Sequence, residues 1–235
     1  MSERLDKLVA SVFDISRREA KESIRAGLVT VDGAEVRDPE QKIEAAARLA
    51  LGGTAADGGQ KIYIMMNKPS GILCASRDAS RETVVDLVPQ GLKRKDLFPV
   101  GRLDKDTTGL LLITNDGDWA HRIVSPAHHV AKTYTVTLDG AVTDEAVKGF
   151  SEGVRLADGE LCKPALLEPT ESAHIARVTL REGKYHQIKR MFGVYGLGVD
   201  ALHRESVGNL LLDGSLDSGE CRALKADEIL AAEEK

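Results

Sequence analysis

Residues 101–117 read GRLDKDTTGLLLITNDG, and this stretch decides the fold of the larger part of the chain. A polar loop bounded by two glycines leads into the apolar run at 110–113, which predicts a buried strand that ends in a turn at Asn-Asp-Gly. A carboxylate in such a loop is held by rigid structure while it faces a cleft, which is a common arrangement for catalytic groups. By pattern alone, Asp104 and Asp106 are equally well explained as ordinary turn residues.

The rest of this region mixes strands and helices without regular alternation. Residues 62–66 form a short apolar run, and residues 133–138 alternate so that Tyr134, Val136 and Leu138 share one face of a strand. We expect a further strand at 176–180. Helices are expected near 118–124, 143–151, 185–194 and 226–234. Because strands and helices do not alternate, we predict an α+β domain with a mixed, mainly antiparallel sheet rather than a doubly wound sheet.

The first fifty residues predict a separate, very small module of helices plus a hairpin. Apolar residues at helical spacing between Leu5 and Phe13 give one helix face, and Ser16 with Glu19 forms a capping box that starts a second helix. Asp32-Gly33 between two β-prone runs predicts a tight hairpin. We place this module at 1–52, a glycine-rich flexible linker at 53–60, and the larger domain at 61–235.

Composition limits the class of protein. The 235 residues are 42% hydrophobic and carry a net charge of −5, and no apolar run approaches the ~20 residues needed to cross a bilayer. With no apolar signal core at the N-terminus, we expect a cytoplasmic protein that does not bind membranes, and a monomer. Three scattered cysteines without Cys-x-x-Cys spacing argue against a disulfide framework and against a zinc site. The acidic net charge argues against nucleic-acid binding, although a local basic face suffices to hold phosphates.

One candidate basic face lies on the second helix. Arg17, Lys21 and Arg25 are four residues apart and share a side, with Arg18 next to them; alone, they fit a solvated surface equally well. The runs RLDK at 4–7, SRREA at 16–20 and IRAGLVTVDG at 24–33 closely resemble the S4 RNA-binding module. This resemblance implies docking on structured RNA. The implied contacts are Arg4, Lys7, Arg17, Arg18, Lys21 and Arg25.

Residues 101–117 resemble the signature of the RsuA/RluA-type pseudouridine synthases, which is Gly-Arg-Leu-Asp, two residues, Thr, one residue and Gly-Leu-Leu. In that family the aspartate of this signature is catalytic, which implies this role for Asp104. The resemblance also implies a role for Arg102, the arginine next to the Leu-Asp pair, in extruding the target base.

Three further segments resemble motifs of the same family in the same order. NKPSG at 67–71 is similar to the first motif, which supports the active-site loop, and KTY at 132–134 is similar to the run whose tyrosine packs on the target base. EGKYHQIKRM at 182–191 is similar to the third motif, where a basic residue pairs with the catalytic aspartate. Many relatives have Gln-Ile-Arg here, so Lys189 takes that role by position and Arg190 is the alternative. Without the family, Tyr134 fits a core aromatic residue and Lys189 a solvated helix residue. Further RNA contacts implied are Lys68, Lys132, His186 and Gln187.

The implied reaction breaks the bond between ribose C1′ and uracil N1, turns the base and rejoins it through C5. No group is lost and no redox change occurs, so neither a cofactor nor a metal is expected. The sequence accordingly lacks a Walker loop, a Gly-x-Gly-x-x-Gly turn and a His-Glu-x-x-His pair. Asp104 must be ionised to act, and a neighbouring cation would keep it so.

The segments SPAHH at 125–129 and YHQ at 185–187 look most like the RsuA branch of the family. That branch modifies a single uridine of small-subunit 16S rRNA, of the position-516 type. The implied partner is 16S rRNA, either naked or in a small-subunit assembly intermediate. Three alternatives stay open: a 23S rRNA target, a non-catalytic S4-type assembly factor, and a glycoside hydrolase that uses Asp104 with Asp106.

Overall fold

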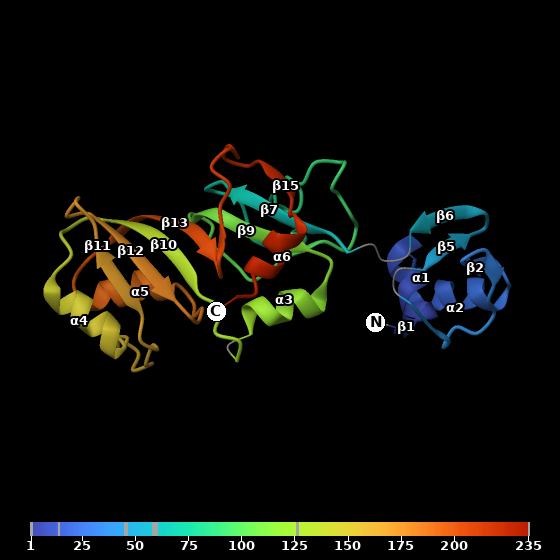
Figure 1. Cartoon of the computed structure of the whole chain (residues 1–235), viewed down its shortest axis with the longest axis horizontal. Helices are drawn as coiled ribbons and strands as arrows, with labels where there is room; N and C mark the ends of the chain where they lie inside the picture. Colours follow the sequence, from blue (N-terminus) through green and yellow to red (C-terminus); the bar gives the residue numbers. More distant parts are fainter. Residues whose placement is uncertain (1, 14, 45–46, 58–60, 126, 235) are drawn as a thin grey trace. The chain divides into compact units, whose positions relative to one another are not determined.

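The computed structural model describes residues 2–13, 15–44, 47–57, 61–125 and 127–234, and it divides the chain into two compact units (Figure 1). The first contains the residues up to Lys61 together with the short segment 94–96, and the second contains the remaining residues from Ile62 onward. Both units mix helices and strands, so the predicted α+β class is confirmed.

The first unit packs two helices against small sheets. Its elements are β1 (Ser2–Arg4), α1 (Leu5–Phe13), α2 (Arg17–Arg25), β2 (Val29–Val31), β3 (Ala34–Glu35), β4 (Lys42–Glu44), β5 (Arg48–Leu51) and β6 (Thr54–Asp57). The capping box predicted at the start of α2 is confirmed: the Glu19 backbone N–H donates to the Ser16 hydroxyl, and the Ser16 N–H donates to the Glu19 carboxylate. Leu5 and Ile24, one from each helix, are completely buried in the core between them.

The hairpin and the linker of this unit have different outcomes. β2 and β3 pair around Asp32 and Gly33, whose φ angles of 51° and 85° are those of the predicted tight turn. The prediction of a flexible linker at 53–60 is wrong for residues 54–57, because they form strand β6 and pair antiparallel with β5. Residues 58–60 lie outside the described residues.

The second unit is built on one sheet whose order is β11-β12-β10-β13-β9-β7-β15, with β14 beside β13 and β8 beside β9. Within the described residues only β13 and β9 pair in parallel in this sheet, so it is mainly antiparallel as predicted. Its strands are β7 (Tyr63–Lys68), β8 (Phe98–Pro99), β9 (Thr108–Thr114), β10 (Lys132–Leu138), β11 (Leu166–Pro169), β12 (Ile175–Leu180), β13 (Val199–Val207), β14 (Leu210–Leu211) and β15 (Cys221–Ala223).

Helices cover both faces of this sheet. Along β9, Leu111 and Ile113 join the core that contains α4 (Asp144–Glu152) and α5 (Gln187–Val194). Leu110 and Leu112 face the other way, into the core that contains α3 (Gly117–Val124) and the neighbourhood of α6 (Ala226–Ala231). Figure 1 shows α4 and α5 beside β10–β12, and α3 and α6 beside β7 and β9. A strand buried on both faces explains the unbroken apolar run at 110–113.

Candidate active site

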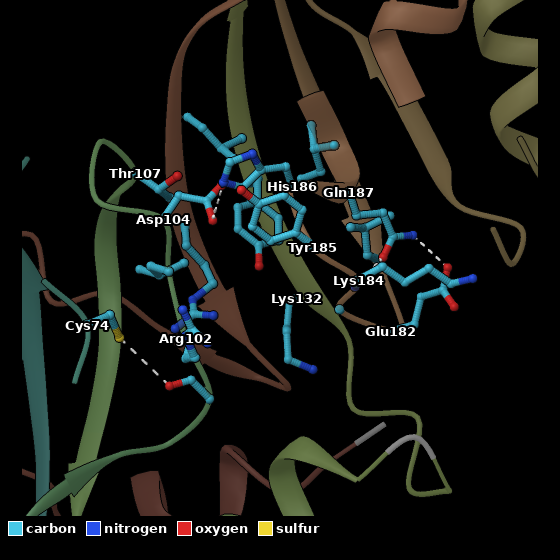
Figure 2. A pocket seen from close by; sticks show the side chains of 18 of the residues that line it. Cys74, Arg102, Asp104, Thr107, Lys132, Glu182, Lys184, Tyr185, His186 and Gln187 are labelled. Carbon is cyan, nitrogen blue, oxygen red and sulfur yellow. Dashed lines mark hydrogen bonds and ion pairs between the residues drawn. The ribbon is translucent and has the colours of Figure 1, made fainter. Parts of the chain in front are cut away.

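A pocket of about 660 Å³ opens in the second unit beside the parallel pair β9–β13 (Figure 2). Its walls come from six separate parts of the chain: Leu73 and Cys74 after β7, the loop before β9, the end of α3, the start of β10, the segment from the end of β12 into α5, and β13. A cavity of this size suits a small-molecule group or a single nucleotide. Long-range pairing, rather than any one motif, therefore assembles the site.

Asp104 lies in this pocket, in the loop between β8 and β9. Its backbone carbonyl accepts a hydrogen bond from the Thr107 N–H at 3.2 Å, which closes a turn, and its side chain is 28% exposed. It lies beside His186, whose Nε2 is 3.5 Å from Asp104 Oδ1 (Figure 2). His186 adopts a left-handed φ of 47° directly before α5, and its ring stacks on that of Tyr185. The local turn and the start of α5 thus bring carboxylate and imidazole together.

Lys68, at the end of β7, holds the loop that carries Asp104 through hydrogen bonds to its backbone. Its side chain is completely buried, and its ammonium donates to the backbone carbonyls of Pro69, Lys105 and Thr107 at 2.9, 3.1 and 3.0 Å. Two of these carbonyls belong to the loop that carries Asp104. The prediction that Lys68 contacts RNA is therefore wrong: burial puts its charge out of reach, and burial also lowers the pKa of its amino group.

A steric constraint explains why a glycine, Gly109, follows the loop. Gly109 has φ 96°, and a Cβ built there would lie 2.4 Å from the backbone oxygen of Arg204 on β13. Only glycine permits so close an approach of the two parallel strands. The side chain of Arg204 is 2% exposed and lines the pocket. Its Nε donates to the Leu110 carbonyl at 2.7 Å, while its Nη2 has no hydrogen-bond partner among the described residues.

Tyr134 and Lys132 enter the pocket from β10. Tyr134, Val136 and Leu138 lie on the buried face of the strand, as the alternation predicted. Tyr134 is 8% exposed and lines the pocket. Lys132 is half-buried on the same wall, where its Nζ donates to the Val130 carbonyl at 3.1 Å. Burial, reinforced by the charge of Arg204, lowers the pKa of Lys132 to about 8.

The expected pairing of Asp104 with Lys189 or Arg190 is not what the structure contains. Lys189 Nζ lies 2.5 Å from Asp106 Oδ2, and this ion pair lowers the pKa of Asp106. Arg190 Nη2 lies 2.5 Å from Asp158 Oδ2. Lys189 does line the pocket. Of the two aspartates in the loop, Asp104 and Asp106, its ammonium pairs with Asp106, which is the more exposed.

Gln187 also differs from its prediction as an RNA contact. It is 4% exposed, its Oε1 accepts from the Lys184 N–H at 2.9 Å, and its Nε2 donates to Glu182 Oε1 at 2.6 Å. Both ends of the amide are therefore occupied within the turn that precedes α5. Arg102, by contrast, is exposed at the pocket, and within the described residues it makes no hydrogen bond or ion pair.

The charge of this pocket is opposite in sign to that of the chain. Seven lysines and arginines line it among the described residues, against two carboxylates, those of Asp104 and Glu182. No group of three or more potential metal ligands occurs in the described part of the chain. In the same residues, no helix is long and apolar enough to span a bilayer. The pocket therefore offers a carboxylate, an imidazole and an aromatic ring within a basic wall.

The basic residues of the first unit converge on one buried acid. The carboxylate of Asp6 is completely buried, and Arg4, Arg17 and Lys21 lie 3.0, 2.9 and 3.7 Å from its Oδ2. The hydrogen bond from Arg4 is the largest cause that lowers the pKa of Asp6 to about 2. The remaining predicted contacts differ: Lys7 pairs with Glu3, Arg18 pairs with Glu22, and Arg25 is exposed. The three clustered cations stay partly exposed at 37%, 56% and 37%, and Arg4 also pairs with Glu40, so three cations face two acids.

One residue of the site, Arg204, escaped the analysis of the sequence, and the contact between His186 and Asp104 was not predicted. Arg204 stands in a polar run of β13, and a register shift in the pairing with β10 places Arg204 opposite Tyr134 and Ser206 opposite Thr133, so no apolar alternation in the sequence marked it as buried. The proximity of His186 to Asp104 had no signal in the sequence, because it depends on the left-handed backbone before α5.

Comparison with known proteins gives a consistent result. Residues 62–193 match the family model for RNA pseudouridylate synthase, and residues 3–49 match that for the S4 domain. The chain is 44% identical over 229 residues to the ribosomal small subunit pseudouridine synthase A of Escherichia coli K12, covering 96% of this chain and 98% of that one. It is 41% identical to an uncharacterised RNA pseudouridine synthase of Bacillus subtilis, with 96% of each chain covered.

A solved structure supports the same assignment. A crystal structure described as a pseudouridylate synthase superposes with a TM-score of 0.70 at 37% sequence identity, covering 97% of this chain and 99% of that one. With the family models, the identities and the fold in agreement, this chain belongs to the RNA pseudouridylate synthase family of enzymes, with an S4 domain at its N-terminal end.

Proposed function

We propose that this enzyme converts one uridine of small-subunit 16S ribosomal RNA into pseudouridine, with Asp104 as its catalytic carboxylate. The observation that carries the proposal is the position of Asp104: a partly exposed carboxylate in a pocket of about 660 Å³, beside His186 and within a basic wall. The E. coli relative named as a small-subunit enzyme matches this chain nearly end to end, which supports 16S rRNA as the target. We expect a uridine of the position-516 type.

The reaction requires an ionised carboxylate next to the glycosidic bond of the target. Whether the carboxylate attacks ribose C1′, adds to uracil C6 or removes a ribose proton, each course starts from the charged form. The wall around Asp104 is basic, and the imidazole Nε2 of His186 lies 3.5 Å from Asp104 Oδ1. The rigid cage around Lys68 holds the loop, so the carboxylate is already placed when the nucleotide arrives.

The target base must leave its stack before Asp104 can reach its glycosidic bond. Flipping costs a few kcal/mol, which stacking on an aromatic side chain offsets. Tyr134 is the aromatic side chain in the pocket wall next to β13, and it is our candidate for this contact. Arg102, exposed and unpaired among the described residues, is the candidate to fill the space that the base vacates.

The S4 domain is the candidate docking element. Its Asp6 cluster presents three partly exposed cations against two carboxylates, those of Asp6 and Glu40, in a chain of net charge −5. Removal of residues 1–52 should weaken the affinity for RNA and flatten its dependence on salt. The substrate is either naked 16S rRNA or a small-subunit assembly intermediate, which parallel assays on both will distinguish.

The deciding experiment compares Asp104→Asn with Asp106→Asn, a matched change in the same loop. RNA labelled with tritium at uracil C5 releases the label when pseudouridine forms. We expect Asp104→Asn to abolish release while it binds RNA with nearly the wild-type affinity, and Asp106→Asn to retain most activity. Wild-type release by Asp104→Asn would refute the catalytic assignment, and a wild-type protein that binds without release would favour an assembly factor.

The target is decided by carbodiimide mapping of both ribosomal RNAs from a strain that lacks the gene. We expect one modified position to disappear from 16S rRNA and to return when the gene is restored. A loss confined to 23S rRNA would overturn the choice of subunit and leave the reaction intact.

A further inference from the structure

We propose that Lys132 and Arg204 form a subsite for a phosphodiester group of the target nucleotide, on the β10–β13 side of the pocket. This inference rests on the proposed function, since it takes a flipped uridine as the occupant. It assigns Arg204 a part in binding and gives Lys132 a defined ligand.

The pairing of β10 with β13 places these two cations on one wall. Tyr134 is the register partner of Arg204, and directly opposite residues of an antiparallel pair project to the same face of the sheet. Lys132 stands two positions before Tyr134 and therefore lies on that face as well. All three line the pocket, with the aromatic ring next to both charged groups.

Two cations on the opposite wall of the pocket are paired with acids, whereas Arg181, just after β12, donates to the His129 carbonyl. There, on the α5 side, Lys189 is paired with Asp106, and Lys184 Nζ lies 2.9 Å from Glu160 Oε1. These cations already have acidic partners. A phosphate would therefore stabilise these paired cations less than it would stabilise a cation that has no acidic partner.

The β10–β13 wall has no such acids. Within the described residues, Arg204 and Lys132 make no ion pair: Arg204 donates to the Leu110 carbonyl, and Lys132 donates to the Val130 carbonyl. The Nη2 group of Arg204 is buried and has no hydrogen-bond partner in the part of the chain that the structure describes. Because an unsatisfied buried donor on a charged group is costly, its persistence suggests a partner that arrives with the substrate.

The titration of Lys132 is consistent with a missing anion. Burial and the charge of Arg204 lower its pKa to about 8, which means that the ammonium form is disfavoured where it stands. A bound anion would reverse that effect by neutralising both cations. In a uridine nucleotide the base and the sugar are neutral, so the anion that the substrate brings is its phosphodiester.

Asp104 does not take the place of that anion. Its ionisable contact is His186, and Figure 2 shows Lys132 and Arg102 pointing into the pocket apart from the Asp104–His186 pair. The pocket thus separates into a carboxylate end for the glycosidic bond and a cationic wall for the backbone. Arg102, exposed on the pocket rim, adds a third cation beside this wall.

The test replaces single phosphodiesters by neutral methylphosphonates in an RNA fragment that contains the target uridine. The linkages 5′ and 3′ of the target are replaced in turn, and a linkage several nucleotides away serves as the RNA control. Each RNA is assayed with the wild type, Lys132→Met, Lys132→Arg and the matched control Lys148→Met, an exposed lysine on α4. Tritium release gives kcat/KM, and dissociation constants are measured in the Asp104→Asn background.

We expect the wild type and Lys148→Met to lose about tenfold in kcat/KM and in affinity at one flanking linkage. Lys132→Met should lose about tenfold on unmodified RNA and less than about twofold more on the neutral linkage. Lys132→Arg should regain sensitivity to it. Arg204→Lys should show the same reduced sensitivity, with thermal unfolding used to confirm that the variant is folded.

Equal losses for the wild type and Lys132→Met at both flanking linkages would overturn the subsite. This outcome is distinct from failure of the proposed function, which would appear as wild-type protein that releases no tritium from any RNA. In that case the dissociation constants still decide whether Lys132 and the flanking phosphate interact.

Discussion

Replacement of Lys68 by methionine tests whether the active-site loop depends on a buried ammonium. The change keeps the length of the side chain and removes its charge, so three backbone carbonyls, those of Pro69, Lys105 and Thr107, lose a donor at 2.9–3.1 Å. Each buried carbonyl left without a partner costs about 1–3 kcal/mol. The variant also avoids the burial of a charge, which offsets several kcal/mol of that loss.

The net expectation is a loss of about 2–4 kcal/mol in the free energy of unfolding, or about 5–15 °C in Tm for a domain of this size. The effect on catalysis should be larger than on binding. A displacement of about 1 Å in a catalytic group costs about a hundredfold in rate. We expect kcat to fall about 10²-fold and KM to change less than about threefold, because substrate contacts lie elsewhere.

The assay combines thermal unfolding, tritium release with separate kcat and KM, and hydrogen exchange of the amides at 104–108. Lys148→Met, an exposed lysine changed to the same residue, is the control. A Lys68→Met protein with wild-type kcat and wild-type protection at 104–108 would refute the reasoning. A loss confined to KM would instead point to direct contact with RNA.

Three further outcomes follow from contacts in the structure. Gly109→Ala should lower Tm by about 5–10 °C in calorimetry, because its Cβ would meet the Arg204 carbonyl at 2.4 Å in a left-handed conformation; an unchanged Tm would contradict the close approach. Lys189→Met should lower kcat no more than Asp106→Asn does in the tritium assay, since the two form one ion pair; a much larger loss for Lys189→Met alone would show that it acts on the catalytic carboxylate. The lowered pKa of Asp6 makes the S4 domain most stable above pH 3.8, the value of a free carboxyl, and the contribution, on the order of 1–2 kcal/mol, is lost as pH falls to about 2. Hydrogen exchange of the full chain across that window measures it, and Asp6→Asn should remove the pH dependence.

Local signals in the sequence predicted the elements whose cause is local. The Ser16–Glu19 capping box and the Asp32–Gly33 turn each need only a few consecutive residues, and both form as expected. Strand β6 was missed because its stability comes from pairing with β5, whereas its glycine-rich surroundings resemble a linker. A glycine-rich composition predicts a flexible segment, but it does not show that a neighbouring strand will pair with that segment and order it.

The site shows the same division between short-range and long-range causes. Family motifs correctly grouped Asp104, Tyr134 and Lys189 around one pocket. They did not determine which acid each cation binds. Asp104 and Asp106 are two positions apart in one turn, and the motif does not say which of them the flexible side chain of Lys189 contacts. Lys68 illustrates a second limit: a lysine before Pro-Ser-Gly reads as an exposed turn residue, and its complete burial arises from strands that are distant in sequence.

The electrostatics of the chain explain how an acidic protein can act on RNA. With a net charge of −5, the molecule as a whole repels a polyanion at long range, but at physiological salt this repulsion is screened beyond about 8 Å. Short-range contacts then decide binding, and Lys132 and Arg204, which have no acidic partner among the described residues, stand at the pocket. Compensated pairs such as Lys189–Asp106 add little to this attraction, so RNA affinity should depend on few positions. We therefore expect the salt dependence of RNA binding to respond strongly to Lys132→Met and weakly to Lys189→Met. A slope of log affinity against log salt that drops equally in both variants would show that the ion pairs open on binding and that the distinction between the two walls is wrong.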